Sequence, residues 1–401
     1  GWRRWGPYLS DRSWGSVRED YSADGNAWAF LPYDKARGKA YRWGEDGIAG
    51  ICDRYQLLCF APAFWNERDP HLKERFFGVN PYEGNHGEDV KDYYFHVDNT
   101  PTHSYMCLLY KYPQRAFPYE DLVRTNQSRA GQGPEYELLD TGIFDDNRYF
   151  DIFIEYAKAV PEDIVIRITV HNRVPEAAPI HIVPTLWFRN TWAWGPVPLP
   201  EPRIDVGRDD WGGQCVVTND AETAPDVNIP VHYRLGTRWL YGPAVTPENG
   251  GEILFTDNET NADRVYGPGN VSRKPHTKDA FHRAICERDR SALKPDEHGT
   301  KAAMHYRYMV PAGGKVELRL RLTDSGKRSP LDDVDGIIAE RRQEADVFFD
   351  GVHPPEASSD EKLVQRKALA GLLWTKQSYI FDVARWLDGD NPDWPPPASR
   401  R

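Results

Sequence analysis

The feature that most constrains this chain is a series of short runs of alternating apolar and polar residues, spread between residues 56 and 323. A period of two places successive side chains on opposite faces of a β-strand. The clearest run, Asp163–Asn172, puts Ile164, Ile166, Ile168 and Val170 on one side. Turn-forming residues separate the runs, and this pattern is typical of an antiparallel β-sandwich, here a large one. Further strands are predicted at Gln56–Trp65, Val90–Val97, Ser104–Tyr112, Leu138–Tyr156, Pro179–Arg189, Gln214–Thr218, Pro230–Leu235, Glu252–Thr256, Met304–Val310 and Lys315–Thr323.

Two hairpins are predicted inside this series. Val90–Val97 and Ser104–Tyr112 are rich in aromatic residues and are separated by the turn-like sequence DNTPT. Leu138–Tyr156 alternates along its length and turns at Asp145–Asn147. Aromatic and β-branched residues favour strands, and a short polar turn between two such runs predicts an antiparallel hairpin.

Two further expectations concern how the strands are placed. Asp163–Asn172 is followed by a short turn and then by Pro179–Arg189, which predicts that these two strands are antiparallel neighbours. Gln56–Trp65 contains Pro62, which has no backbone N–H to donate. This run is therefore expected to bend or to lie at the edge of a sheet.

Helical spacing of apolar residues occurs in three places. Tyr119–Arg129 is a predicted short helix with acidic residues at its start, and two longer helices, Leu331–Val352 and Ser358–Leu387, follow the last strand. Apolar residues cover most of the circumference of Ser358–Leu387, so this helix needs neighbours on several sides. We expect further helical structure beyond Arg401 to supply them.

The opening stretch, Trp2–Asp53, follows neither pattern because glycines and prolines interrupt any regular period. Its aromatic content is too high for a disordered tail, so we expect ordered, irregular backbone lying across a scaffold. Aromatic rings beside charged and amide side chains suit a sugar, whose apolar faces stack on rings while its hydroxyls bind polar groups. The alternative is that these residues mainly pack a seam between two domains. The aromatic residues include Trp2, Trp5, Trp14, Trp28, Trp43, Tyr8, Tyr21, Tyr33 and Tyr41.

Charge excludes some classes of partner. Lys and Arg total 50 against 61 Asp and Glu, which gives a formal net charge of -11. Such a surface repels nucleic acid and anionic membranes. No apolar run approaches the ~20 residues of a membrane span. We therefore expect neither a nucleic-acid nor a membrane partner.

The chain has five cysteines, an odd number, and no two of them have CxxC spacing. Most lie in apolar, strand-like runs, which favours buried free thiols in a reducing compartment. We therefore expect a cytoplasmic protein. The chain begins at Gly1 without a signal-like segment, and the earlier removal of a targeting peptide stays open.

A first group of candidate site residues lies in the loop Glu83–Asp89, where His86, Glu88 and Asp89 could orient a substrate. The alternative is a merely solvated loop. A metal ion would need further ligands, and HxH and HxxxH spacings are absent from the sequence, so no metal site is predicted. Asp20–Asn26 resembles the first half of a calcium loop but lacks the later ligands, and is predicted to be a turn. GxSxG, P-loop and GxGxxG motifs are also absent, and no cofactor is expected.

A second group of candidates follows directly on a predicted strand. Arg189, Asn190, Trp192 and Trp194 lie at or just beyond the end of Pro179–Arg189. Tryptophan rings with Arg and Asn beside them could form a stacking platform for a sugar. The alternative is that the loop simply packs onto the sandwich.

Several long motifs resemble one known family. WRRWGPYLSDRSWGSVREDYSADG, AYRWGEDGIAGICD, EGNHGEDVKDYYF, PTHSYM, LLDTGIFDDNRYFDIFIEYAKA and HIVPTLWFRNTWAWG are similar to the N-terminal half of bacterial glycoside hydrolase family 63-like proteins, often called glucosidases. The resemblance implies a super-β-sandwich, a linker helix and a C-terminal (α/α)6 barrel. It places the domains at 1–328 for the sandwich with its N-terminal segment, 329–357 for the linker helix, and 358–401 for the first helix of a truncated barrel.

The resemblance also implies inverting hydrolysis of α-glucosidic or related bonds, with an acid and a base that both lie in the barrel. No catalytic residue is therefore assigned to this chain. We expect a non-catalytic portion of a glycosidase that shapes one side of the active site, with an oligosaccharide substrate and its own barrel as partners. One alternative is a carbohydrate-binding or structural docking module. Another is part of a glycoside phosphorylase, which would need a basic phosphate-binding cluster that this sequence does not show.

Overall fold

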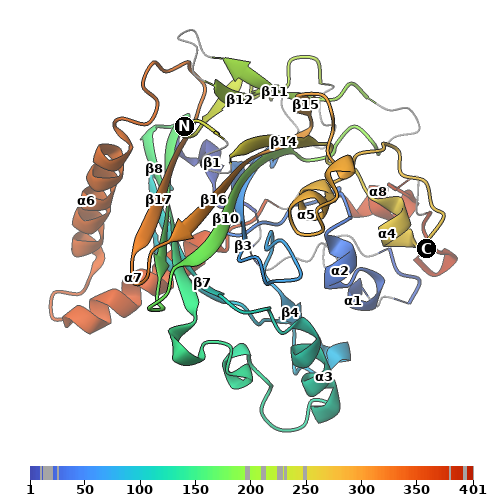
Figure 1. Cartoon of the computed structure of the whole chain (residues 1–401), viewed down its shortest axis with the longest axis horizontal. Helices are drawn as coiled ribbons and strands as arrows, with labels where there is room; N and C mark the ends of the chain where they lie inside the picture. Colours follow the sequence, from blue (N-terminus) through green and yellow to red (C-terminus); the bar gives the residue numbers. More distant parts are fainter. Residues whose placement is uncertain are drawn as a thin grey trace.

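The computed structural model describes residues 1–9, 11, 21–24, 27–194, 199–208, 214–223, 229, 233–246, 251–378, 381–391 and 395–400. The chain is mainly β, with two large antiparallel sheets followed by helices after the last strand (Figure 1). The predicted fold class, an antiparallel β-sandwich followed by C-terminal helices, is confirmed. That these helices begin an (α/α)6 barrel stays a prediction, and so do the domain boundaries.

The two large sheets have six and nine strands, and a separate pair of short strands lies apart from them. In order across the six-stranded sheet the strands are β1 (Trp5–Gly6), β2 (Ile51–Asp53), β3 (Leu58–Trp65), β10 (Ala178–Phe188), β16 (Lys301–Val310) and β14 (Glu252–Thr256). In order across the nine-stranded sheet they are β15 (His298–Gly299), β11 (Arg203–Arg208), β12 (Gln214–Asn219), β13 (Arg238–Tyr241), β17 (Lys315–Thr323), β9 (Asp163–Asn172), β8 (Tyr149–Val160), β7 (Tyr105–Pro113) and β6 (Tyr93–Asn99). The short pair is β4 (Gly78–Val79) and β5 (Asp89–Val90).

The main hydrophobic core fills the space between the two large sheets. Ile164, Ile166 and Ile168 of β9 are each at most 1% exposed, and they share one apolar cluster with Phe60 of β3 and Ile182 of β10. Burial of one such side chain contributes about 1.5–3 kcal/mol. The inward faces predicted from alternation are therefore the faces that hold the sandwich together.

One predicted hairpin is confirmed and the other is wrong. β6 and β7 pair antiparallel, with Tyr94 opposite Tyr110. Leu138–Thr141 instead forms a 3-10 turn, and the strand begins only at Tyr149. The residues between them include Asp146, at a φ of 60°. Left-handed backbone of this kind ends an extended strand, so the alternation before it has no sheet partner.

The predicted pairing of β9 with β10 is also wrong, because the two strands lie in different sheets. β9 pairs with β8 and β17, whereas β10 pairs with β3 and β16. Both strands turn alternate apolar residues toward the same core from opposite sides. Alternation identifies the buried face of a strand but not its partner.

Two other predictions of strands need correction. The proline- and tryptophan-rich stretch after Asn190 contains a strand, β11, that was not predicted. Pro230–Leu235 was predicted as a strand, but its described part, Tyr233–Leu235, is irregular, and Pro230 lies outside the described residues. The residues Asp20, Gly25 and Asn26 of the calcium-like sequence lie outside the described residues as well.

Pro62 lies within β3 in the interior of the six-stranded sheet and not at an edge. It stands directly opposite Pro184 of β10. In the pairing of β10 with β16, Ile182 and Thr185 have partners, whereas the two residues between them do not. The pairing of β2 with β3 ends at Phe60, two positions before Pro62. The two prolines therefore sit where the ladder is already interrupted, so their missing N–H groups cost little.

The last helices cover the outer face and edge of the nine-stranded sheet. α6 (Val334–Val352) packs Val334 and Ile338 against the side of β7 and β8 that faces away from the core. α7 (Ser359–Trp374) begins with a capping box between Ser358 and Glu361 and lies beside β6. Figure 1 shows α6 on the far side of the nine-stranded sheet from β3 and β10.

The prediction of one continuous helix over Ser358–Leu387 is wrong. α7 ends at Trp374, and a separate short helix, α8 (Val383–Asp388), follows. Trp374 donates its indole N–H to the carbonyl of Asp98 at 2.9 Å and packs into the main core. The helix does not continue beyond Trp374. In the segment that follows, the Ser378 hydroxyl donates to the carbonyl of Arg54 at 2.6 Å.

The N-terminal stretch is ordered, irregular backbone over its described residues, apart from β1, β2 and two short helices. These are α1 (Ala27–Phe30) and α2 (Tyr33–Ala36). Trp43 donates its indole N–H to Asp390 at 2.5 Å and packs edge-on to Phe381. The stretch therefore joins the six-stranded sheet to the segment around α8.

Three more helices complete the described fold: α3 (Tyr119–Arg129), which confirms the predicted bounds, α4 (Ala262–Tyr266) and α5 (Ala280–Ile285). α5 packs on the outer face of the six-stranded sheet through Phe281 and Ile285. A search of the described helices finds none with the length and apolar character needed to cross a bilayer.

Candidate functional site

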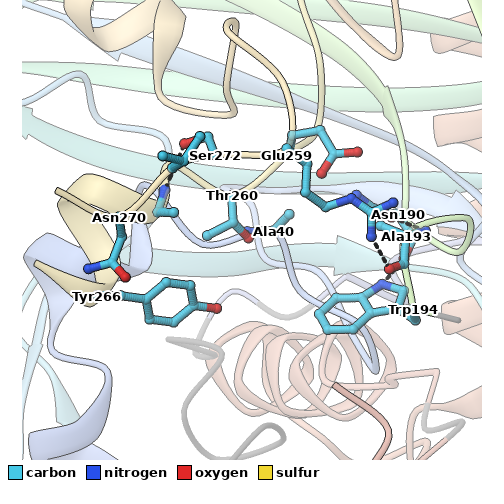
Figure 2. A pocket seen from close by; sticks show the side chains of 12 residues that line it. Ala40, Asn190, Ala193, Trp194, Glu259, Thr260, Tyr266, Asn270 and Ser272 are labelled. Atoms are coloured by element: carbon cyan, nitrogen blue, oxygen red, sulfur yellow. Dashed lines mark hydrogen bonds between the residues drawn. The ribbon is translucent and has the colours of Figure 1, made fainter. Parts of the chain in front are cut away.

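A cavity of about 190 Å³ opens where the loops after β10 and β14 meet (Figure 2). Asn190 and Trp194 come from the loop after β10, and Glu259 comes from the loop after β14. Tyr266, the last residue of α4, lines the cavity as well. The other lining residues are Ala40, Ala193, Thr260, Ala262, Asn270, Val271, Ser272 and Arg273.

The loop after β10 is held by its own hydrogen bonds and by the neighbouring strand end. The Asn190 amide donates to the carbonyl of Asn258 at 2.8 Å and accepts from the N–H of Ala193 at 3.2 Å. The indole N–H of Trp194 donates to the carbonyl of Asn190 at 2.5 Å. β10 and β14 flank the same strand, β16. Their loops therefore leave the sheet close together and can build one wall.

Two aromatic rings stand on opposite sides of the cavity in Figure 2, that of Trp194 and that of Tyr266. The Lys39 ammonium lies 4.9 Å from the centre of the Trp194 ring and donates to the Tyr266 hydroxyl at 3.4 Å. The Arg42 guanidinium lies 5.3 Å from the Trp194 ring. Cation–π contacts of this kind stabilise the position of a ring. The rings are therefore fixed before any ligand arrives.

Glu259 is the one carboxylate that lines this cavity among the described residues. Its side chain is 3% exposed and accepts a hydrogen bond from the Trp192 indole N–H at 3.0 Å. Burial raises the pKa of Glu259, while the Trp192 hydrogen bond and the charges of Lys274 and Arg273 act against that shift. A held carboxylate beside two rings can accept hydrogen bonds from the hydroxyls of a neutral ligand.

The second group of predicted site residues divides into lining and supporting residues. Asn190 and Trp194 line the cavity. Trp192 is 2% exposed and supports the cavity by donating its indole N–H to Glu259. Arg189 is also 2% exposed and donates to the carbonyls of Gln56 at 3.0 Å and Arg42 at 2.6 Å. Its described bonds tie the N-terminal segment to the end of β10.

The first group of predicted site residues lies elsewhere, beside the loop that follows α3. α3 is labelled in the lower part of Figure 1. His86 is exposed; its backbone N–H donates to Glu135 at 2.7 Å, and its ring lies 2.9 Å from the carbonyl of Gly131. Glu88 is half-buried, and Asp89 begins β5. The structure does not bring these three residues into the cavity of Trp194. Their role in substrate binding stays a prediction.

A cluster of carboxylates around Asp89 contains its own cation. Oxygen atoms of Asp89, Glu135 and Glu137 lie within 4.8 Å of one another. The buried Lys91 ammonium donates to them at 3.3, 3.3 and 2.8 Å, respectively. A lysine at the centre supplies the positive charge that a metal ion would otherwise bring. We read the cluster as the contact that fixes the loop 83–91 against the loop 129–137.

Sequence reasoning missed Glu259, Tyr266, Asn270 and Arg273. The signal that could have found Glu259 is the polar sequence DNETN at 257–261, which follows β14 directly. Polar residues at a strand end are frequent in binding sites. The strand Glu252–Thr256 was predicted, but its place two strands from β10 depends on the sheet order.

Comparisons with known proteins give a sequence relative and a set of structural neighbours. Over 440 aligned positions the chain is 39% identical to "Uncharacterized protein YMR196W" of Saccharomyces cerevisiae, and the match covers 100% of this chain and 39% of that protein. No family model matches. A solved structure named "Putative kojibiose phosphorylase from human microbiome" aligns with a TM-score of 0.22 and 8% identity, over 56% of this chain and 21% of that chain. A score this low carries no argument about fold or function, whereas the yeast match shows that a relative of this chain is much longer than the chain itself.

Proposed function

We propose that this chain is the β-sandwich part of a longer carbohydrate-active protein and that the cavity of Trp194 and Tyr266 binds one sugar unit. The observation that carries the proposal is the arrangement of two fixed aromatic rings around a cavity that contains a buried carboxylate and the side-chain amides of Asn190 and Asn270. Rings bind the apolar faces of a pyranose, and a carboxylate and amides bind its hydroxyls. The volume of about 190 Å³ is below the roughly 300–1,000 Å³ typical of drug-sized ligands and suits a small one.

Binding is favoured over hydrolysis for this chain. Glycoside hydrolysis uses two carboxyl groups that face each other across the bond to be broken. Among the described residues that line the cavity, Glu259 is the one acid. We therefore assign the chain a saccharide-binding role and place any hydrolytic residues in another part of the longer protein.

The resemblance to family 63-like glycosidases and the length of the yeast relative support the wider part of the proposal. In that proposal the longer protein acts on α-glucosidic or related bonds, and this chain shapes one side of its active site. The remaining part of the longer protein would pack on the apolar side chains that α6 and α7 expose, including Val347, Val364 and Leu372. Large exposed apolar side chains on two helices are compatible with such an interface.

Isothermal titration calorimetry of the chain with glucose, maltose and a neutral non-sugar polyol of similar size tests the proposal. We expect saturable binding of a sugar, with affinity at least about ten-fold weaker in Trp194→Ala, because a stacking face is lost. Glu259→Gln should weaken binding less, since an amide oxygen still accepts a hydrogen bond. Trp239→Ala on β13, a half-buried tryptophan that does not line the cavity, is the matched control. Sugar binding that is unchanged in Trp194→Ala, or absent in the folded wild type, contradicts the proposal.

A further inference from the structure

A second hollow, of about 690 Å³, is lined in part by Gly1 and the residues that follow it. The N-terminus is marked in Figure 1. Four arginines line the hollow: Arg3, Arg4, Arg54 and Arg234. They gather on a chain whose formal net charge is -11. This local positive charge is opposite in sign to the net charge of the chain, and it creates a local electrostatic field that attracts anions.

Ion pairs among the described residues involve one of these four arginines. Arg4 is paired with Glu162 at 3.4 Å, and Glu162 is also paired with Arg238 at 2.8 Å. For Arg3, Arg54 and Arg234 the described part of the chain provides no carboxylate within ion-pair distance. Within the described residues, three guanidinium groups therefore share one hollow without an ion-pair partner.

Aromatic rings contact two of the four arginines. The rings of Tyr55 and Tyr233 meet edge to face, with centres 4.7 Å apart. The Arg54 guanidinium lies 5.3 Å from the Tyr55 ring, and the Arg4 guanidinium lies 4.9 Å from the Tyr233 ring. Arg4 also donates to the Tyr233 hydroxyl at 3.0 Å and to the backbone carbonyl of Arg234 at 2.7 Å, and Arg3 donates to the carbonyl of Pro101 at 3.2 Å. These contacts position Arg3, Arg4 and Arg54 around the hollow.

We propose that this hollow binds a phosphate group, either free or as the monoester of a small molecule whose uncharged part contacts the rings. Guanidinium groups bind phosphate oxygens through paired N–H donors, and three unpaired ones suit a dianion better than a single carboxylate. A long polyanion is disfavoured, because the acidic remainder of the surface repels it. The proposal is independent of the saccharide cavity.

The charges around the hollow also affect its neighbours. Burial, followed by the charges of Lys158, Lys376 and Arg3, lowers the pKa of His103 to about 3. Burial and Arg3 lower the pKa of Lys376 as well. Burial is the larger cause of both pKa shifts, and the nearby positive groups add to it. The sequence showed no basic cluster because the four arginines are up to 231 positions apart, and only folding brings them together.

Titration calorimetry in a chloride buffer, with inorganic phosphate, glucose 1-phosphate and glucose as separate probes, tests this proposal. We expect one saturable site for the phosphate-bearing probes, with affinity at least about ten-fold weaker in the double variant Arg54→Gln, Arg234→Gln. The control double variant Arg124→Gln, Arg203→Gln removes the same charge from two exposed positions and should bind as the wild type does. Tighter binding of glucose 1-phosphate than of phosphate identifies a monoester ligand, and equal binding identifies free phosphate.

Two results would overturn the proposal: no saturable binding of either phosphate probe to the folded chain, or an equal loss of affinity in both double variants. The second result would mean that net charge alone controls binding. Phosphate binding should persist in Trp194→Ala, so failure of the saccharide cavity and failure of the phosphate site give different outcomes.

Discussion

The Nδ1 atom of His181 lies 2.7 Å from the Nε2 atom of His305, on the outer face of the six-stranded sheet. The other ring nitrogen of His181 is 3.0 Å from Glu67, and that of His305 is 3.1 Å from Glu252. These contacts form a line of four side chains, glutamate–histidine–histidine–glutamate. Each of the three gaps needs one proton, but two neutral rings supply only two.

We predict that the third proton is held by the pair of rings and not by the glutamates. Although burial acts against it, hydrogen bonds from His305 and Arg290 lower the pKa of Glu252 to about 2, and those from Arg307 and His181 lower the pKa of Glu67. With both glutamates ionised, the three hydrogen bonds of the line need three protons on the two imidazole rings together.

Nitrogen-15 NMR of the histidine rings near pH 7 measures this directly. We expect three protonated nitrogens on the two rings together. Glu252→Gln should remove the extra proton, because the amide no longer stabilises a cation, whereas Glu356→Gln in the exposed loop between α6 and α7 should leave it. Two neutral rings in the wild type would disprove the assignment.

Acid should destabilise the fold through His103. This residue is fully buried, and its Nδ1 lies 2.9 Å from the amide oxygen of Asn99. Its folded pKa of about 3 is below the ordinary 6.5. Between those values the unfolded chain binds more protons, so the free energy of unfolding falls as the pH falls through that window. The contribution is up to about 1.4 kcal/mol per pH unit.

The variant His103→Asn should flatten this dependence, and asparagine tolerates the positive φ of 54° at this position. Between pH 7 and pH 4.5 we expect the wild type to lose about 2–3 kcal/mol more than the variant does, measured by urea unfolding at each pH. The exposed His86→Asn variant should keep the wild-type slope. Parallel curves for wild type and His103→Asn would refute the assignment.

We predict that Asp390 stabilises the contact between the N-terminal stretch and the segment around α8. Its carboxylate accepts from the Trp43 indole at 2.5 Å and lies 3.5 Å from the Arg42 Nε, and its carbonyl accepts from Arg42 at 2.8 Å. Asp390→Ala removes the carboxylate and leaves buried donors behind. We expect a loss of about 3–5 kcal/mol in the free energy of unfolding, whereas Asp388→Ala at an exposed position should change it by less than about 0.5 kcal/mol. Urea unfolding measures both, and equal effects would contradict the prediction.

The apolar side chains on α6 and α7 should promote association of the chain with itself. Val364 and Leu372 are 62% and 70% exposed and lie eight positions apart on α7, which places them about 80° apart around the helix and within one broad side of it. The double variant Val364→Lys, Leu372→Lys should reduce concentration-dependent association in light scattering while its thermal unfolding stays close to that of the wild type. Leu139→Lys, at a side chain that is 55% exposed and lies outside α6 and α7, is the control. Association that persists in the double variant would show that another surface is responsible.

The alternation and the helical spacing of apolar residues predicted most strands and helices, because these patterns indicate which side of each element is buried. Asp163–Asn172 and Tyr119–Arg129 have the predicted bounds, and Ile164, Ile166 and Ile168 face the core as alternation requires. The pattern failed where an outcome depended on a partner distant in sequence. The interior position of Pro62 requires Pro184 opposite it. The end of α7 at Trp374 reflects a docking place at Asp98 in the β6–β7 hairpin.

The candidate site shows the same division. Asn190 and Trp194 were identifiable because they directly follow an apolar strand, and both line the cavity. Glu259 and Tyr266 were not, because β14 comes near β10 only through β16, which lies between them in the sheet. His86, Glu88 and Asp89 were plausible as a polar loop, but folding places them beside the loop that follows α3.

The sequence by itself determined a mainly β chain with a large alternating core and helices after the last strand, because burial of one face leaves a periodic trace in every element. Tertiary structure alone decided which strands share a sheet, which loops meet at the cavity and which arginines gather at the second hollow. Those outcomes depend on contacts between residues far apart in sequence, such as Arg4 with Arg234 and Trp192 with Glu259. No local period encodes such contacts, and the chemistry of both proposed sites arises from them.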